Sequence, residues 1–218
     1  MNVKQNILER RTANVKSVPS VQLSPAAVKR KVTAQIYKGK YQRLGTVAIP
    51  DINICLPVYD QPYNSQALSR GAQQLKSVNA SKIEVDNAMG SGNFILVAHN
   101  YNDGKSMFSP LQQYINKDAP YLVNGRPAED HWIDGMNVFM ANDKGVYKYK
   151  IISQKTISAT DTSVRRDSEE PELNIITCLF PSDTYRIDTR AKLVKQWSWN
   201  NAPNSALKPF DNTYNLRK

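Results

Sequence analysis

Short runs of apolar residues, rich in β-branched and aromatic side chains, recur along the chain from residue 46 onward. Glycine, proline, asparagine and aspartate separate them, as is typical of strands joined by turns. The runs cover residues 46–49, 52–59, 94–99, 137–141, 146–158, 175–179 and 185–195. Between Val146 and Ile151 apolar and polar positions alternate, so one strand face should be buried and the other solvated. The pattern predicts a mostly β fold: a seven- to eight-stranded closed or nearly closed β-barrel with short helices and loop insertions.

Both ends of the chain lack this periodicity. Residues 1–30 form a stem that we expect to be partly disordered or to hold a short helix over residues 24–32, begun by Ser24 and Pro25. Residues 31–196 are the expected barrel domain, and residues 197–218 follow as a tail. Residues 116–131 read as an inserted loop. At 218 residues, one domain with appendages is the simplest organisation.

The net charge of +10 is concentrated near the N-terminus. Residues 1–45 contain ten basic side chains and a single acid, Glu9, so the rest of the chain is close to neutral. A basic stem suits anionic lipid headgroups or a polyanionic wall, although a solvated leader explains it equally well. A polyanion-binding or nucleic-acid-binding barrel is an alternative. Against it, Tyr37 and Tyr41 are the only rings among the basic residues, and base stacking needs more.

Three residues at predicted strand ends could form a nucleophilic site. Cys178 ends an apolar run, Arg186 follows eight positions later on the next run, and His99 closes the run that starts at Phe94. A thiol attacks as the thiolate, which a nearby cation stabilises. The other cysteine, Cys55, lies inside an apolar run where a small buried thiol packs well, although a pairing of the two cysteines stays open.

These residues belong to blocks that resemble the sortase family, most of all its class A housekeeping type. The match runs over roughly residues 32–195, and the order and spacing of the blocks are more specific than any one of them. The blocks are residues 45–50 with 54–59, residues 68–72, residues 97–99 with 108–111, and residues 173–178 with Arg186.

The resemblance implies a cysteine transpeptidase that cleaves a sorting signal of the Leu-Pro-X-Thr-Gly type after threonine, through a thioacyl intermediate. The acceptor would be an amine of the cell-wall precursor, with no cofactor and no nucleic acid. It also implies a place on the outer face of the plasma membrane of a Gram-positive bacterium. Since no run approaches the roughly 18 apolar residues of a membrane span, we expect a soluble ectodomain cut from an anchored precursor.

By resemblance the catalytic residues are Cys178 as nucleophile, His99 as acid and base, and Arg186 as the cation at the carbonyl oxygen. Strand parity cannot choose between Arg186 and Arg190, which would lie on one face; the family spacing chooses Arg186. His131, in the inserted loop, matches no block and is expected to be structural. The expected substrate-binding residues, each of which could instead be core, are Val97, Val164, Ile176 and Thr177.

Some class A sortases bind calcium beside the block at 68–72, on a helix that the resemblance expects there. Here Lys76 and Asn79 stand where carboxylates would be wanted, and calcium prefers six to eight hard oxygen ligands. We therefore expect no metal requirement, although Glu169 and Glu170 lie in the loop before the cysteine. A sortase-like binding module without activity remains an alternative. Residues 1–50 lack the Asp-Pro-aromatic lid motif of pilus-building sortases.

Overall fold

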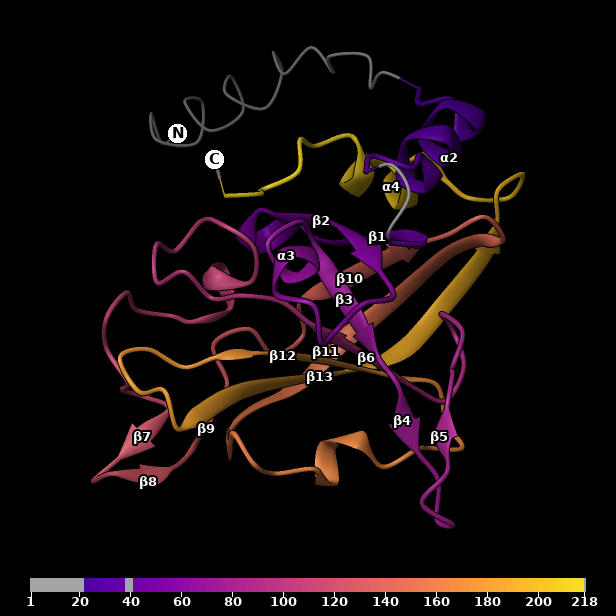
Figure 1. The fold of residues 1–218 in the computed structure, drawn as a ribbon. Helices are drawn as coiled ribbons and strands as arrows, with labels where there is room; N and C mark the ends of the chain where they lie inside the picture. Colours follow the sequence, from indigo (N-terminus) through magenta and orange to yellow (C-terminus); the bar gives the residue numbers. More distant parts are fainter. Residues whose placement is uncertain (1–21, 38–40, 218) are drawn as a thin grey trace, which may run out of the picture.

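The computed structural model describes residues 22–37 and 41–217, and within these residues eight strands close into a barrel (Figure 1). Strand β11 pairs with both β10 and β13, which joins the two ends of the sheet. The order around the barrel is β10-β1-β2-β3-β6-β12-β13-β11. The predicted mostly β barrel is thus confirmed. Its strands are β1 (Arg43–Ile49), β2 (Ile54–Tyr59), β3 (Ala72–Leu75), β6 (Asn93–Val97), β10 (Asn137–Ala141), β11 (Gly145–Ser158), β12 (Glu172–Cys178) and β13 (Tyr185–Ser198).

Alternation along β11 separates core from solvent. Tyr147, Tyr149 and Ile151 are buried in the main core, whereas Lys150 and Ile152 are exposed. Each such fully buried large apolar side chain contributes about 1.5–3 kcal/mol relative to an exposed one. The ladder to β13 shifts between Ile151 and Ser153, and this irregularity resets which residues of β11 are buried.

Strand β3 was missed by the sequence analysis, in which the resemblance expected a helix beside the block at residues 68–72. The helix α3 (Ser65–Leu68) ends earlier, and β3 begins at Ala72. Its sequence is polar, yet Gln73 and Gln74 are buried because backbone carbonyls satisfy their amides. Gln73 Nε2 donates to Ala67 O at 2.7 Å, and Gln74 Nε2 donates to Asn87 O at 2.7 Å. Polar side chains hide this strand from a hydrophobicity pattern.

The two ends of the described chain pack together on one end of the barrel (Figure 1). Helix α2 (Pro25–Thr33) begins as predicted, with the Ser24 side chain accepting from the backbone of Ala27. Its Val28 and Val32 pack in one cluster with Phe210. That cluster includes residues of α4 (Asn204–Leu207) and η4 (Lys208–Phe210). Residues 1–21 of the predicted stem lie outside the described residues.

Shorter elements decorate the barrel. The expected insertion holds the hairpin β7 (Leu122–Val123) and β8 (Arg126–Pro127), and β9 (Glu129–Asp130) extends the sheet at β11. A second hairpin, β4 (Ser77–Val78) and β5 (Glu84–Val85), follows β3. One-turn helices are η1 (Pro50–Ile52), η2 (Ser109–Leu111) and η3 (Ser163–Arg165). No helix in the part of the chain that the structure describes is long and apolar enough to cross a membrane.

Candidate active site

The strand register brings the three predicted catalytic residues to one groove. Strands β12 and β13 are antiparallel and place Cys178 directly opposite Arg186. Strand β6 runs parallel to β12 with Val97 opposite Ile176, and the pairing continues as Ala98 N donates to Ile176 O. His99 therefore leaves β6 at the level at which Cys178 ends β12, and Cys178, His99 and Arg186 line the same groove.

The groove is a mostly apolar cavity of about 430 Å³. Val97 and Ile176 line it from adjacent strands, and Leu75 and Leu68 add apolar surface from β3 and α3. Tyr63, which is 79% exposed, stands at its rim. A groove of this kind suits an extended segment with apolar side chains, and its reactive groups gather where β6 and β12 end.

The two cysteines differ sharply in their surroundings. Cys178 is a free thiol, partly exposed at the groove end of β12. Cys55 is also free but is buried in β2, and this burial raises the pKa of its thiol to about 11 despite Lys31 and Arg43 nearby. Since the thiolate is the nucleophilic form, only Cys178 combines access with a partner cation.

The two histidines differ as well. His99 is half-buried in the groove, and desolvation lowers the pKa of its imidazole, so burial favours the neutral ring. The Tyr101 ring packs on it, with centroids 5.1 Å apart. His131 is exposed and lies outside the groove lining; its Nδ1 is 2.7 Å from Asp134 Oδ2, which raises its pKa.

Arg186 and Arg190 share a strand face, as parity predicted, but only Arg186 reaches the groove. Its Nη1 donates to the carbonyl oxygens of Asp183 and Tyr185, both at 2.8 Å, which holds the guanidinium at the strand end. Arg190 lies opposite Asn174 instead, and its Nε is 3.6 Å from Oδ2 of the buried Asp188.

The predicted substrate-binding residues occupy different layers. Val97, Ile176 and Thr177 line the groove. The Thr177 hydroxyl donates to Ala98 O at 2.9 Å, so it ties β12 to the end of β6. Val164 is not part of the lining: it is buried in η3 and packs in one cluster with Ile176 and Val97. The structure thus places Val164 behind the groove, as a support of its wall.

Sequence reasoning overlooked two buried amides, Asn100 and Gln112, that join the histidine and cysteine segments. Asn100 Nδ2 donates to Cys178 O at 2.9 Å and to Gln112 Oε1 at 2.8 Å. Gln112 Nε2 donates to Phe180 O, and Phe180 N donates back to Gln112 Oε1. An asparagine directly after a strand-end histidine was the available signal, but it reads equally well as a turn residue.

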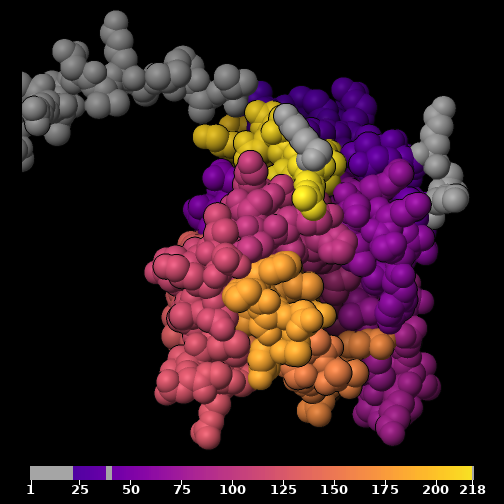
Figure 2. All heavy atoms as spheres, turned by 60° about the vertical axis from the view of Figure 1, so that its left-hand side comes forward, coloured from indigo at the N-terminus to yellow at the C-terminus, as the bar shows by residue number. Residues whose placement is uncertain are grey.

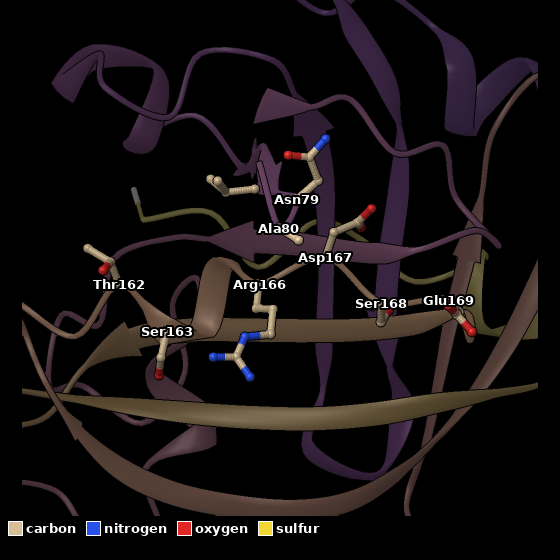
Figure 3. Close-up of a pocket in the computed structure, with 9 residues that line it drawn as sticks. Asn79, Ala80, Thr162, Ser163, Arg166, Asp167, Ser168 and Glu169 are labelled. Carbon is tan, nitrogen blue, oxygen red and sulfur yellow. The ribbon is translucent and has the colours of Figure 1, made fainter. Parts of the chain in front are cut away.

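A larger hollow of about 890 Å³ lies away from the thiol, between the tip of the β4–β5 hairpin and the loop that carries η3 (Figure 3). Asn79 and Ala80 line it from the hairpin, and residues 162–163 and 166–169 line it from the loop. Arg165 clamps the two together, donating to Glu84 Oε1 at 2.6 Å and to Lys76 O at 3.0 Å.

Asp167 provides a second clamp between the loop and the barrel. Its Oδ1 accepts hydrogen bonds from Asn93 N of β6 and also from Ser77 Oγ and Asn87 Nδ2. Although desolvation alone would raise the pKa of this carboxyl, these hydrogen bonds outweigh it and hold the pKa below its ordinary value. The segment after Ala72, where the resemblance expected a helix, is strand and hairpin, with a guanidinium at its contact with the loop.

Comparison with known proteins identifies the family of this chain. The Sortase domain family model matches residues 47–194. Sortase A of Streptococcus agalactiae is 28% identical over 84% of this chain and 66% of its own length, and sortase A of Listeria monocytogenes is 26% identical over 65% and 51%. The chain thus spans between about half and two thirds of the length of these relatives.

Solved structures show the same fold. The Listeria monocytogenes sortase A structure aligns with a TM-score of 0.60 at 23% identity, covering 78% of this chain and 99% of that one. Sortase C-3 of Streptococcus pneumoniae aligns with a TM-score of 0.55 at 15% identity, covering 82% and 83%. The family match spans most of the barrel, and its relatives by sequence are class A enzymes. The chain belongs to the sortase family and is class A-like.

Proposed function

We propose that this chain is a cysteine transpeptidase that cleaves a Leu-Pro-X-Thr-Gly-type sorting signal between threonine and glycine. It joins the new threonine carboxyl end to an amine of the cell-wall precursor. The observation that carries the proposal is the convergence of Cys178, His99 and Arg186 on one apolar groove. The same reasoning puts the enzyme on the outer face of the membrane of a Gram-positive bacterium.

The first half-reaction forms an acyl-enzyme. The Cys178 thiolate attacks the threonine carbonyl carbon, a carbon–sulfur bond forms, and the carbonyl electrons move to its oxygen. As the intermediate collapses, the carbon–nitrogen bond breaks, and His99 as the imidazolium gives its proton to the departing glycine amine. The product is a thioester on Cys178 and a neutral His99, the form that burial of the ring favours.

The second half-reaction runs in the opposite direction. Neutral His99 takes a proton from the incoming amine as its nitrogen attacks the thioester carbon. The new amide forms, and the carbon–sulfur bond breaks to release the Cys178 thiolate. His99 and Cys178 are then imidazolium and thiolate again, so protons and charge balance over the cycle.

Arg186 stabilises the oxyanion of both tetrahedral intermediates. Its place opposite Cys178 puts a permanent cation beside the developing charge, and its bonds to Asp183 O and Tyr185 O hold the guanidinium there. Among the described residues no carboxylate forms an ion pair with it. Removing one oxyanion donor in acyl-transfer enzymes costs about 10²–10³ in rate.

The apolar part of the groove receives the leucine and proline of the signal. Val97 and Ile176 line it from adjacent strands, together with Leu75 and Leu68. Val164 supports Ile176 from behind, and Thr177 keeps β6 and β12 in register through its bond to Ala98 O. These contacts set the direction in which the peptide approaches the thiolate.

The test is to incubate the protein with a Leu-Pro-X-Thr-Gly peptide and an oligoglycine or alanyl amine, and to follow acyl adduct and transfer product by mass spectrometry. We expect an adduct on Cys178 and a product that needs His99. His131→Ala is the matched control for His99→Ala and should keep full activity. An adduct on Cys55 would contradict the site, and peptide binding without any adduct would identify an inactive binding module.

A further inference from the structure

Residues 211–217 follow η4 and lie beyond the family match. They reach the loop after His99, residues 100–108, which we call the histidine loop. In Figure 2 the C-terminal residues, in yellow, lie against the magenta part of the chain that holds residues 100–110. Lys31 of α2 fixes the start of the segment, since its Nζ donates to Asp211 O and Asn212 O. Tyr214 adds to this, with its hydroxyl donating to Lys31 O.

We propose that Asn215 and Arg217 of this segment are positioning residues for His99, so that the appendage after the barrel is a functional part of the active site. The inference rests on the proposed function, because it takes His99 as the catalytic acid and base.

Asn215 is the anchor, because all of its polar groups are bonded. Towards the barrel, its N–H donates to Cys55 O at 3.1 Å and its Oδ1 accepts from Cys55 N at 2.9 Å. Towards the histidine loop, its carbonyl accepts from Met107 N at 2.8 Å. Its Nδ2 donates to Met107 O at 2.8 Å and to Lys105 O at 3.0 Å. One residue thus fastens the loop to β2.

Met107 transmits this restraint to His99. It is fully buried and has a positive φ of 53°, a conformation that costs a non-glycine residue free energy unless its surroundings enforce it. Asn100 and Met107 form an isolated β-bridge, and Phe108 N donates to His99 O at 3.0 Å. The backbone of His99 is therefore held through Met107 on one side, while Asn100 holds it to Cys178 O on the other.

Arg217 acts on the ring rather than on the backbone. Its guanidinium lies 4.4 Å from the centroid of the Tyr101 ring, and that ring packs on the His99 imidazole at 5.1 Å and an interplanar angle of 41°. Tyr101 thus contacts both the Arg217 guanidinium and the His99 imidazole. A cation held over an aromatic face restricts the ring beneath it, so Arg217 limits how far Tyr101, and with it His99, can turn.

If the segment only stabilised the fold, variants of it would lower the melting temperature and leave kcat and the titration of His99 unchanged. Variants of the full chain distinguish the two roles: Asn215→Ala, Arg217→Ala and Arg217→Lys, with Lys148→Ala as the matched control. Lys148 lies over Phe139 at 5.8 Å in a similar contact away from the groove. The readouts are kcat and KM for peptide cleavage below the melting temperature, and an NMR titration of His99 with His131 as internal reference.

We expect Asn215→Ala to lower kcat about tenfold, the worth of one to two net hydrogen bonds, with little change in KM. Arg217→Ala should lower it about two- to fivefold, and Arg217→Lys should retain most of the parent rate. In both alanine variants the pKa of His99 should rise towards its ordinary 6.5, since its contact with Tyr101 loosens. None of these variants alters the other titratable groups around His99, which are Cys178, Arg186, Tyr63 and Tyr101. Lys148→Ala should match the parent.

The proposal is wrong if the alanine variants shift only the melting temperature and leave kcat and the His99 titration as in the parent. If Asn215→Ala fails to fold, Arg217→Ala still tests the proposal. Arg217 is exposed, so its truncation leaves no cavity in the core. If the parent itself cleaves no peptide, the proposed function fails, while the His99 titration still tests the positioning.

Discussion

The groove end and the middle of the β12–β13 ladder share the same strands and the same alternation, yet their charged side chains lie in different surroundings. At the groove end, Cys178 and Arg186 face each other in a partly open site. Two residue pairs further along, Asp188 is fully buried, and Arg190 forms an ion pair with it at 3.6 Å. The difference comes from the loop with η3, which covers the ladder around Asp188 and leaves the groove end at Cys178 open.

That cover is built from specific contacts. Asn174 Nδ2 donates to Val164 O, and Val164 packs on Ile176, so η3 lies over this part of the ladder. Under it, both carboxylate oxygens of Asp188 lack a hydrogen-bond partner among the described residues. Cys178 and Arg186 are accessible because no loop covers their end of the ladder. The buried charge of Asp188, on the same face, instead lowers the stability of the fold.

Replacing the thiol should have the largest effect. Cys178→Ala should lower cleavage and transfer by more than about 10⁴, because no second thiol lines the groove among the described residues. The melting temperature should stay near that of the parent, since Cys178 is partly exposed. Activity assays and thermal unfolding check this, with Cys55→Ser as a variant that keeps acylation. Cleavage at a rate near that of the parent would refute the assignment.

Replacement of each arginine by alanine should have the next largest effect. Arg186→Ala should lose about 10²–10³ in kcat with an unchanged unfolding free energy. Arg190→Ala should lose little activity but about 1–3 kcal/mol of stability, because it leaves the Asp188 carboxylate without its partner. Paired kinetic and denaturant measurements separate these effects. If Arg190 proved to be the essential cation, the contrast between the groove end and the middle of the ladder would be wrong.

The buried carboxyl should make stability depend on pH. Desolvation raises the pKa of Asp188 from 3.8 to about 6, against the opposing attraction of Arg190 and Lys155. Between these values the unfolded chain is ionised while the folded one still holds the proton. Stability that is present below pH 3.8 is therefore lost, by about 3 kcal/mol, as the pH rises through 6. Asp188→Asn should remove this loss, as urea unfolding at pH 4 and pH 7 can measure, whereas an unchanged slope would contradict the raised pKa.

The smallest effect is expected from metal. Arg165 joins the η3 loop to the β4–β5 hairpin through Glu84, where a calcium-binding relative would need oxygen ligands around a cation. Activity should stay within a factor of about two between a chelator and millimolar calcium. Steady-state kinetics in both buffers test this. A several-fold stimulation by calcium that the chelator reverses would show that Glu169 and Glu170 create a site after all.

The amino-acid sequence by itself determined the strands with apolar runs, the Ser24 cap of α2 and the spacing of eight between Cys178 and Arg186. These features depend on neighbours within a few residues, whose periodicity and turn chemistry are local. Strand parity alone left Arg190 open, because it is identical for both arginines; the family spacing favoured Arg186, and the ladder to β12 places Arg186 opposite the thiol.

Only the tertiary structure decided the rest. The polar strand β3, the Asn100–Gln112 link and the docking of Asn215 depend on amides that hydrogen-bond to backbone far away in the sequence. The sequence does not indicate which backbone group an amide side chain will bond, because that group comes within about 3 Å only when the chain folds. Local pattern alone therefore could not identify the residues that hold the histidine beside the cysteine.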